Sequence, residues 1–483
     1  MSNVDSSRAH WALGVAIGAV VFYVTLVSFN TQVLASQDLY LHISVGRWIL
    51  NSGHVPDHGI FSGSMPEAPW VAHEWLASVG FAYLYDHLGW GGVLAATSLM
   101  LALAIGVLTF DVARTLGPLV AIALAVLSWG LCINHLVARP HVAALPLMVI
   151  WLAAHARARR KDRAPPLVLA LVMTLWANLH GSFMFGLAFT LLFAAEAVFE
   201  AESPRQARGA AAQWGLFLGA AVLAAAITPQ GPGGLLFPLQ MMGLSAALGT
   251  VNEWQPSTVI NNAPLYAWFF LLLFVSLLQG VRVPICRLAM FMLLLYMALA
   301  HRRHAELLGL ATPILLQHVI AEKLSAAPSV VSSWGAMARP AVQSAVAGIA
   351  LSVACLSAVV LCRDVTRGPD KFTPSMALNA VEARGIKGPV LNAQNFGGYM
   401  IFRGYRPFID GRVDMYGNEF MLKYTAVDQL PAVLEQYHIA WTIFEPSNPR
   451  TILMDHLTGW SRIYADSTAV VYLRQAGASH QPR

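Results

Sequence analysis

Charged side chains are scarce in this sequence. Asp, Glu, Lys and Arg together make up 11% of its 483 residues, whereas soluble domains usually carry about 25%. Hydrophobic residues account for 57% of the chain, and a soluble fold of this length could not hide so much apolar surface. The shortage of charge therefore excludes an ordinary soluble protein and predicts a polytopic α-helical membrane protein.

Cysteine is also rare, and the four cysteines lack the spacing of metal ligands. They lie within or at the ends of apolar runs, which indicates packing residues. The net charge of +5 does not indicate nucleic-acid binding, because the basic residues lie in short loops between apolar runs. There they are expected to set the membrane topology, and we expect no nucleic-acid partner. The cysteines are Cys132, Cys286, Cys355 and Cys362.

Long apolar runs are the dominant feature that is present. A membrane-spanning helix needs about 20 apolar residues, and eleven segments, two of them short, are predicted to span. The first lacks an A-x-A cleavage site, so we expect it to be retained as a helix. Residues 70–88 carry charge at both ends and are expected to form a re-entrant or interfacial helix. The predicted spans are 12–34, 91–113, 117–136, 141–157, 165–179, 183–200, 211–228, 264–281, 286–301, 304–322 and 340–362.

The distribution of lysine and arginine predicts the orientation of these helices. The loop at 155–166 is the most basic short loop and should be cytoplasmic, and the basic loops at 202–210 and 280–287 alternate correctly with it. Counting outward places the N-terminus inside and the C-terminal segment outside, as an odd number of spans requires. Most polar clusters outside the basic loops then fall on the outer side.

The composition changes near Arg363, where a water-soluble segment begins. We predict a transmembrane domain over 1–362, with a large first outer loop at 36–90, and an extracytoplasmic α/β domain over 363–483. Strands that alternate with helices favour the α/β class. The predicted strands are 388–393, 407–410, 439–445, 461–466 and 469–474, and the predicted helices are 374–384, 418–437 and 449–458.

The first outer loop gathers acids and imidazoles in an otherwise apolar chain. Asp38 and His42 are four residues apart, so on a helix they share one face. A carboxylate beside an imidazole can act as a general base, can orient the ring, or can bind a divalent cation. The alternative is a solvated interfacial helix, but "PDHGIFS" and "HEW" follow in the same loop, which is more polarity than a connector needs.

His73 and Glu74 are adjacent, so on a helix their side chains would diverge by about 100°. Together with Trp75, Glu74 could instead anchor the chain at the membrane interface, where tryptophan is favoured. No H-E-x-x-H spacing is present, so the indication of a metal site is weak. Asp38 and His42 are the candidate ligands for a divalent ion.

A second group of polar residues lies at the predicted outer ends of the spans. Arginines are disfavoured there by the positive-inside rule, which makes their presence informative. Guanidinium groups suit phosphate, and a lipid phosphate would lie at this depth; the alternative is contact with lipid headgroups. Ionisable groups at membrane depth usually serve a site, so we predict one outward-facing polar cavity. Its substrate-binding candidates here are Arg139, His141, His180, Arg302 and Arg303.

The densest polar stretch of the C-terminal segment is 395–420. The pair Gly397 and Gly398 permits a tight turn or a close backbone approach. Asp410, Arg412 and Asp414 alternate after a predicted strand, so their side chains are predicted to point the same way. They would contact a sugar or a cation, or they would form a salt-bridged turn without a ligand.

These features resemble the GT-C superfamily of integral-membrane glycosyltransferases, in which a long outer loop with an acid near its start follows the first span. The sequence is also similar to a pattern in bacterial membrane proteins: D-x-x-x-H at 38–42, "GRWIL" at 46–50, "HVPDHGIFS" at 54–62, "HEW" at 73–75 and a tail with "GGYMIF" and "FIDGRVDMYG". It departs from characterised GT-C enzymes in having D-x-x-x-H where those have paired acids.

The resemblance implies a bacterial inner-membrane enzyme that transfers sugar from a polyprenyl-phosphate carrier to a glycan, lipid or protein acceptor on the extracytoplasmic face. It implies a role as base or acceptor-site residue for the first-loop acid, which is Asp38 here, and several members of the group use a divalent metal. His42 would assist Asp38, and Glu74 is a further catalytic candidate. Positive charge for the leaving phosphate would come from Arg139, Arg302 and Arg303. The alternatives are a transporter or flippase, a non-catalytic assembly protein, or another lipid-linked transferase. The remaining substrate-binding candidates are His73, His141, His180, Asp410, Arg412 and Asp414.

Overall fold

The computed structural model describes residues 3–133, 136–249, 251–326, 365–367 and 370–475. Its contacts divide the chain into two compact units, each built from several segments. The helical unit comprises Met1–Val33, Gly91–Pro238 and Val251–Asp364, and the mixed unit comprises Leu34–Trp90, Leu239–Thr250 and Val365–Arg483. The division into a transmembrane and an extracytoplasmic domain stays a prediction.

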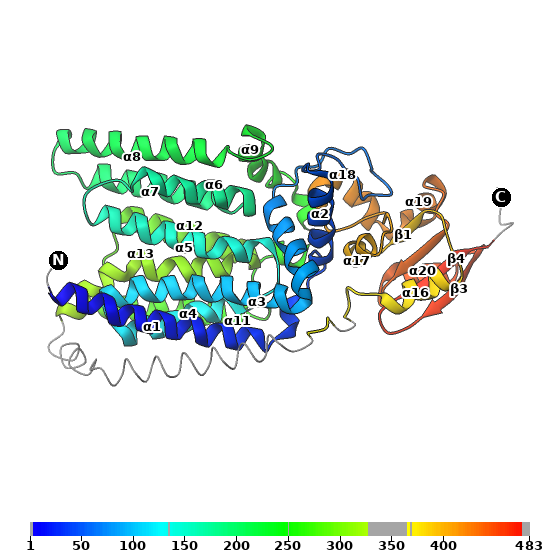
Figure 1. The fold of residues 1–483 in the computed structure, drawn as a ribbon, viewed down its shortest axis with the longest axis horizontal. Helices are drawn as coiled ribbons and strands as arrows, with labels where there is room; N and C mark the ends of the chain where they lie inside the picture. Colours follow the sequence, from blue (N-terminus) through cyan, green and yellow to red (C-terminus); the bar gives the residue numbers. More distant parts are fainter. Residues whose placement is uncertain (1–2, 134–135, 250, 327–364, 368–369, 476–483) are drawn as a thin grey trace. The chain divides into compact units, whose positions relative to one another are not determined.

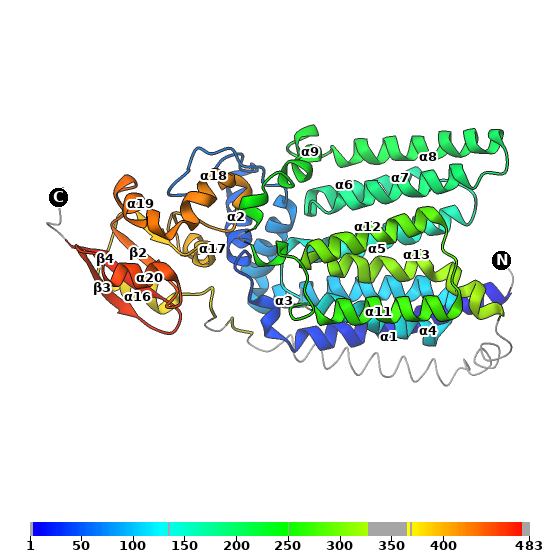
Figure 2. The ribbon, with the colours of Figure 1, turned by 180° about the vertical axis from the view of Figure 1, so that it is seen from behind.

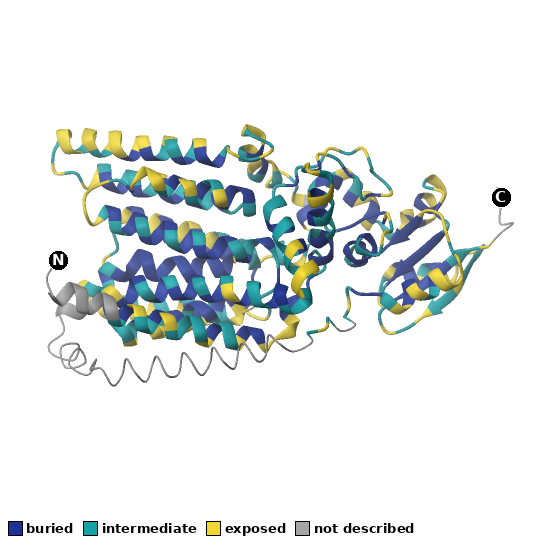
Figure 3. Cartoon of the chain, viewed as in Figure 1, coloured by how far each residue is buried: buried dark blue, intermediate teal, exposed yellow. Residues whose placement is uncertain are grey.

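The helical unit consists of long apolar helices that run side by side and roughly parallel (Figures 1 and 2). Burial is greatest on the central helices α5 and α13, whereas α8 exposes many residues (Figure 3). The helices are α1 (Asn3–Ser28), α3 (Trp75–Leu116, of which Gly91 onward belongs here), α4 (Pro118–Cys132), α5 (Pro140–Arg159), α6 (Ala170–Leu179), α7 (Phe183–Phe199), α8 (Pro204–Ala225), α9 (Pro232–Met241, which belongs here as far as Pro238), α11 (Ala263–Gln279), α12 (Ile285–Ala300) and α13 (Ala305–Ala326). The short turns are η1 (Thr31–Leu34, which belongs here as far as Val33), η3 (Leu167–Leu169), η4 (Asn252–Trp254) and η5 (Arg302–His304).

Local sequence explains where these helices begin and end. Proline occupies the first turn of α4, α5 and α8, where its missing N–H removes no helical hydrogen bond. Gly117 separates α3 from α4 with φ of 89°, and Gly280 ends α11 with φ of 55°. Both conformations are left-handed, which glycine adopts without the strain imposed by a Cβ atom.

Each predicted span from 12–34 to 304–322 contains a helix, and the span at 340–362 lies outside the described residues. By length and composition, three helices of the described chain are apolar enough to cross a membrane: Trp11–Ser28, Trp75–Leu116 and Pro140–Arg159. Shorter apolar helices accompany them, including α4, α7, α11 and α12. The polytopic helical class is thereby supported, while the number of spans and their orientation stay predictions.

The mixed unit contains a four-stranded sheet in the order β1-β2-β4-β3. β1 (Val390–Asn392) pairs in parallel with β2 (Trp441–Phe444), and both strands are buried along their whole length. β4 (Val470–Arg474) is antiparallel to β2 and to β3 (Trp460–Ala465). The unit also holds α2 (Leu39–Ser52), α10 (Ser245–Leu248), η6 (Gln394–Phe396), α16 (Ser375–Ala383), α17 (Gly397–Phe402), α18 (Val413–Thr425), η7 (Val427–Gln429), α19 (Leu430–Gln436) and α20 (Pro449–Asp455).

Two local predictions for this unit were wrong. The segment 407–410 is a loop, because the buried side chain of Asn392 takes the place of a strand partner. Its Oδ1 accepts the backbone N–H of Phe408 at 2.8 Å, and its Nδ2 donates to the carbonyl of Ile409 at 2.8 Å. The predicted helix at 418–437 is divided between α18 and α19, and Pro431 lies in the first turn of α19.

The first loop is integrated with the C-terminal segment through close backbone contacts at glycines. A Cβ atom on Gly398 would lie 2.4 Å from the carbonyl oxygen of Gln37, and one on Gly411 would lie 2.1 Å from Oδ1 of Asp38. Leu41, Val45 and Ile49 of α2 form one buried cluster with Ile401 of α17. Residues far apart in the sequence therefore share one hydrophobic core within the mixed unit.

Candidate functional site

The mixed unit assembles an acid–imidazole cluster, which we define as Asp38, His42, His73, Glu74 and Asp414. Asp38 immediately precedes α2, but its carboxylate does not cap that helix. The carboxylate lies instead against Gly411. His42 follows one turn later, and its backbone N–H donates to the carbonyl of Asp38 at 2.9 Å. The predicted i, i+4 arrangement on a helix is therefore present.

Glu74 lies between two imidazoles. Its Oε2 is 3.7 Å from Nε2 of His42, and its Oε1 is 3.7 Å from Nε2 of His73. The expected divergence of His73 and Glu74 is wrong, because these residues form a turn and α3 begins only at Trp75. The side chains of His42 and Glu74 are only 12% and 21% exposed, so protein screens their interaction from much of the solvent.

Ser78 contacts His42, and this contact could not be predicted from the sequence. Its Oγ lies 2.9 Å from Nδ1 of His42 and donates to the carbonyl of Glu74 at 3.1 Å. A hydroxyl has a single proton, and serine inside a helix commonly donates it to the carbonyl four residues earlier. Oγ then accepts a hydrogen bond from Nδ1–H of His42. The neutral ring keeps its lone pair on Nε2, and Glu74 stabilises the ring when Nε2 gains a proton.

Asp414, in the first turn of α18, is electrostatically linked to this cluster. Burial raises its pKa and the Glu74 carboxylate adds to the rise, whereas His73 and Arg412 oppose it. A carboxyl group that resists ionisation near an imidazole can hold or exchange a proton with it. Asp414 is therefore linked to this cluster through His73 and Glu74.

Asp410 and Arg412 form a buried ion pair with each other. Nε and Nη2 of Arg412 donate to the two carboxylate oxygens of Asp410 at 2.8 and 2.7 Å, and Tyr416 donates to Oδ2 at 3.0 Å. Burial alone would raise the pKa of Asp410, but the charge and hydrogen bonds of Arg412 outweigh it and hold the pKa below its usual value. Arg412 also covers the ring of Trp70 at 4.7 Å. These contacts favour the salt-bridged turn over ligand contact for this pair.

The residues of the mixed unit do not match a metal centre. Within the described part of the chain, no three His, Cys, Asp or Glu side chains are grouped as metal ligands. Both ring nitrogens of His42 already face protein groups, Ser78 and Glu74. The donor set around Asp38 and His42 therefore does not fit a divalent ion.

The helical unit assembles a guanidinium cluster, which we define as Arg139, His180, Glu253, Arg302 and Arg303. The Glu253 carboxylate pairs with Arg139 through Oε2 and with Arg303 through Oε1, the latter at 3.1 Å. Arg303 also lies over the ring of Trp254, 4.8 Å from its centroid. One acid therefore holds together two arginines that are far apart in the sequence.

His180 completes this cluster. Nη2 of Arg303 lies 3.4 Å from Nε2 of His180. Nδ1 of His180 accepts the backbone N–H of Ser182 at 3.1 Å and lies 2.8 Å from Oγ of Ser182. Trp176 donates to the same hydroxyl at 2.9 Å. The polar loop after α6 is thus fixed by its own hydrogen bonds.

His141 faces a buried carboxylate that sequence reasoning missed. Its Nε2 lies 3.7 Å from Oε2 of Glu306, in the first turn of α13, and its ring centroid is 6.1 Å from that of His180. Glu306 is separated from Arg303 by only two residues, but Arg302 and Arg303 drew attention to the positive charges alone. An acid in the turn after a basic pair is a signal that can be read from the sequence.

Arg302 differs from Arg303 in its surroundings. Its backbone N–H donates to the carbonyl of Gln255 at 3.1 Å, which fixes the chain. Its guanidinium forms no ion pair with any residue that the structure describes, whereas Arg139 and Arg303 share Glu253. Arg302 therefore differs from Arg139 and Arg303 in having no carboxylate partner among the residues that the structure describes.

The predicted site residues thus form two groups. Asp38, His42, His73, Glu74 and Asp414 lie in the mixed unit beside the buried Asp410–Arg412 pair, and Arg139, His141, His180, Arg302 and Arg303 lie in the helical unit. The first group can accept and donate protons, and the second can bind an anion. The single cavity expected from the sequence stays a prediction.

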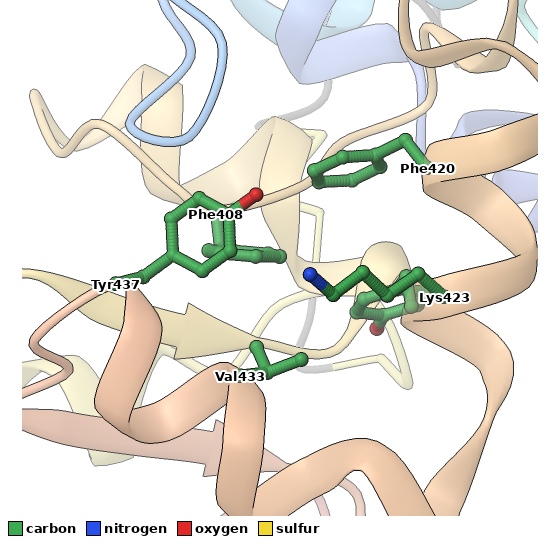
Figure 4. A pocket seen from close by; sticks show the side chains of 6 residues that line it. Phe408, Phe420, Lys423, Val433 and Tyr437 are labelled. Atoms are coloured by element: carbon green, nitrogen blue, oxygen red, sulfur yellow. The ribbon is translucent and has the colours of Figure 1, made fainter.

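The mixed unit also has a small apolar hollow (Figure 4). Phe408 packs edge-on against Tyr437 with centroids 4.8 Å apart and is stacked on Phe420 at 5.4 Å. Lys423, also in the lining, is hydrogen-bonded to Gln436. No predicted site residue lines this hollow. Its lining comes from α18, from α19 and the residue after it, and from the loop before α18.

No protein-family model matches the chain, and no curated protein matches it. Among solved structures, the apo oligosaccharyltransferase of Archaeoglobus fulgidus matches with a TM-score of 0.54 and 12% identity, over 91% of this chain and 69% of that one. ArnT from Cupriavidus metallidurans, bound to undecaprenyl phosphate, matches with a TM-score of 0.52 and 14% identity, over 98% and 99%. The chain therefore shares its fold with these two solved structures.

Proposed function

We propose that the chain is a membrane glycosyltransferase that moves a sugar from a polyprenyl-phosphate donor to an acceptor hydroxyl. The observation that carries this proposal is the presence of two polar clusters with different chemistry. The acid–imidazole cluster has groups that can take up a proton, and the guanidinium cluster has groups that carry positive charge. Sugar transfer from a lipid phosphate needs a base for the acceptor and positive charge for the departing phosphate. The fold shared with two solved transferases supports the same reading.

Asp38 is the candidate base, and His42 with Glu74 assists it. The acceptor hydroxyl loses its proton to the carboxylate as its oxygen bonds to the anomeric carbon of the sugar. The bond between that carbon and the phosphate oxygen breaks, and the electron pair leaves with the polyprenyl phosphate. Positioned proton transfer of this kind contributes about 10²–10⁴-fold to a rate. His42 can receive the proton on Nε2, where Glu74 stabilises the resulting charge.

Arg302 is the candidate contact for the donor phosphate, supported by Arg139 and Arg303. Charge on the leaving oxygens grows as the sugar departs, and fixed guanidiniums stabilise that charge without reorganising. Glu253 holds Arg139 and Arg303 in place, which limits how far they move during the reaction. ArnT is bound to undecaprenyl phosphate in its solved structure, which makes this lipid the first ligand to test.

A transporter or flippase is the principal alternative. It would need polar groups that line a path through the helical unit. The buried acids at the other ends of its helices are paired instead: Asp111 with Arg157 at 3.1 Å, and Glu196 with Arg287 at 2.9 Å. Paired charges of this kind stabilise helix ends and offer little to a moving solute. The transferase therefore accounts better for the described polar groups.

The decisive test is Asp38→Asn in purified full-length protein, reconstituted with an undecaprenyl-phosphate sugar and an acceptor. The amide matches the carboxylate in size beside Gly411 but cannot take a proton, so we expect sugar transfer to fall by about 10²–10⁴-fold. Binding of undecaprenyl phosphate should remain. Asp57→Asn is the matched control, because this acid of the same loop is 91% exposed; its transfer rate should be unchanged. Full activity in Asp38→Asn would rule out the proposed base.

A further inference from the structure

The ends of α3 and α5 carry arginines that the proposed function does not use. Arg114 is in the last turn of α3 and Arg160 follows the last residue of α5. Asp111 of α3 links these two helix ends, because its Oδ1 lies 3.1 Å from Nε of Arg157 on α5. Arg114 lies one turn after Asp111, and Arg160 lies one turn after Arg157. We define Asp111, Arg114, Arg157 and Arg160 as the basic end.

Charge at the basic end is not balanced. Asp111 is 2% exposed and is already occupied by Arg157 and by Gln317, whose Nε2 donates to Oδ2 at 2.8 Å. Arg114 and Arg160 are exposed and form no ion pair with any residue in the described ranges. The three guanidiniums of this cluster, Arg114, Arg157 and Arg160, therefore face the single carboxylate of Asp111, which leaves a positive surface at this end of the helical unit.

Arg160 in particular lacks an anionic partner. Its Nη1 contacts Nε2 of His318 on α13, an imidazole that supplies no negative charge. Partial burial lowers the pKa of Arg160, and repulsion from Arg157, Arg114 and Arg287 lowers it further, while Asp111 opposes the change. A guanidinium that is repelled by its neighbours gains from any anion that binds beside it.

The adjoining helix presents an apolar surface that starts at the same end. α4 begins two residues after α3 ends, and it packs on α13, which carries His318. Leu119, Ile122 and Val126 are 53%, 46% and 55% exposed. Their spacing of three and four residues places them on one face of α4. Positive charge beside an exposed apolar stripe complements a molecule with an anionic head and an acyl chain.

We propose that Arg114 and Arg160 bind the phosphate of an anionic membrane phospholipid, whose acyl chain lies along Leu119, Ile122 and Val126. This site is distinct from the guanidinium cluster, because Arg139 of that cluster immediately precedes α5 whereas Arg160 follows the last residue of the same helix. A helix of 20 residues is about 30 Å long at 1.5 Å per residue. The phospholipid would therefore bind without occupying the groups assigned to the sugar donor.

The test is the binding of phosphatidylglycerol to the purified full chain in detergent, followed by native mass spectrometry. The double variant R114A/R160A should raise the half-saturating lipid concentration by about tenfold, because two charge-assisted contacts are lost. The control R205A/R208A also removes two exposed arginines, on α8, and should change it less than about twofold. R114K/R160K keeps the charge and should bind with intermediate affinity.

Three outcomes would overturn the proposal. Equal losses in both double alanine variants would indicate general attraction between a basic protein and an anionic lipid. Unchanged binding in R114A/R160A would show that these arginines do not contact the phosphate. Displacement of phosphatidylglycerol from the basic end by equimolar undecaprenyl phosphate would assign the site to the carrier lipid. Phosphatidylcholine, which has no net charge, should bind R114A/R160A and the parent chain equally.

Discussion

The acid–imidazole cluster and the guanidinium cluster use charge in different ways. In the mixed unit, the Asp410–Arg412 pair is buried and self-contained, while Asp38, His42 and Glu74 stay partly exposed beside it. In the helical unit, a single carboxylate, Glu253, is shared by Arg139 and Arg303. The first arrangement separates structural charge from reactive charge. In the guanidinium cluster, Arg139 and Arg303 both stabilise the structure through Glu253 and supply positive charge for a ligand. Arg302 is the exception, because it has no such carboxylate partner among the described residues.

This difference matches the two demands of the proposed reaction. A base must change its protonation state in every cycle, so it benefits from a surrounding scaffold whose own charges are already neutralised. A phosphate-binding group keeps its charge throughout, because arginine does not titrate in the working range of pH. It can therefore form part of the scaffold without losing its function. Three pairs of substitutions test this difference between the clusters.

The largest effect is expected from breaking the buried pair in the mixed unit. Asp410→Asn leaves the Arg412 guanidinium buried without its counter-charge, which costs about 3–5 kcal/mol of the free energy of unfolding. Hydrogen exchange of the full-length protein should show this as loss of protection around β1, α17 and α18. If protection is unchanged, the pair does not support the cluster and the proposed separation of structural from reactive charge is wrong.

Asp414→Asn is the matched control, because the pKa shifts of the two acids have opposite signs. The pKa of Asp410 is lowered, so its contribution to stability is present above the ordinary value of about 3.9 and is lost as pH falls through the native value. The pKa of Asp414 is raised, so its ionisation destabilises the fold as pH rises from about 3.9 through the native value. At neutral pH Asp414→Asn should be neutral or slightly stabilising.

A smaller effect separates the two neighbouring arginines of the helical unit. Arg302→Ala should weaken undecaprenyl phosphate binding by at least about tenfold, since a hydrogen bond to a charged group contributes about 1.5–3 kcal/mol. Arg303→Ala should weaken it less, because Glu253 already neutralises that guanidinium. Lipid titration by native mass spectrometry measures both. If Arg303→Ala has the larger effect, the phosphate is bound by the arginines that pair with Glu253, and the assignment of Arg302 as the phosphate contact is wrong.

The sequence predicted those features that depend on neighbours along the chain. The i, i+4 relation of Asp38 and His42 follows from helical geometry, and the strands β1, β2, β3 and β4 follow from short apolar runs. Features set by distant residues were missed. Asn392 converts the predicted strand at 407–410 into a loop through hydrogen bonds across 16 and 17 residues.

The positioning of His42 was missed for the same reason. Ser78 is 36 residues away from it, and nothing in a run of "WLASVG" distinguishes a serine that orients a histidine from one that only packs. Glycines were easier to notice than to interpret. Gly398 was singled out from the sequence and Gly411 was not, and glycine is needed at both positions because Gln37 and Asp38 of the first loop approach them closely.

The smallest effect is expected from substitutions of Ser78, which test whether its hydroxyl orients His42. A group that transfers a proton needs a fixed orientation, whereas a group that only supplies charge does not. Ser78→Thr keeps the hydroxyl that binds Nδ1, whereas Ser78→Val has nearly the same shape without it. One neutral hydrogen bond contributes about 1 kcal/mol, so kcat in Ser78→Val should be roughly five- to tenfold below that in Ser78→Thr, with KM for the lipid donor unchanged. Because both variants add the same methyl group beside the buried Ser78 position, any packing cost cancels between them. Equal kcat values would show that Ser78 only packs against His42, and the imidazole would then owe its orientation to Glu74.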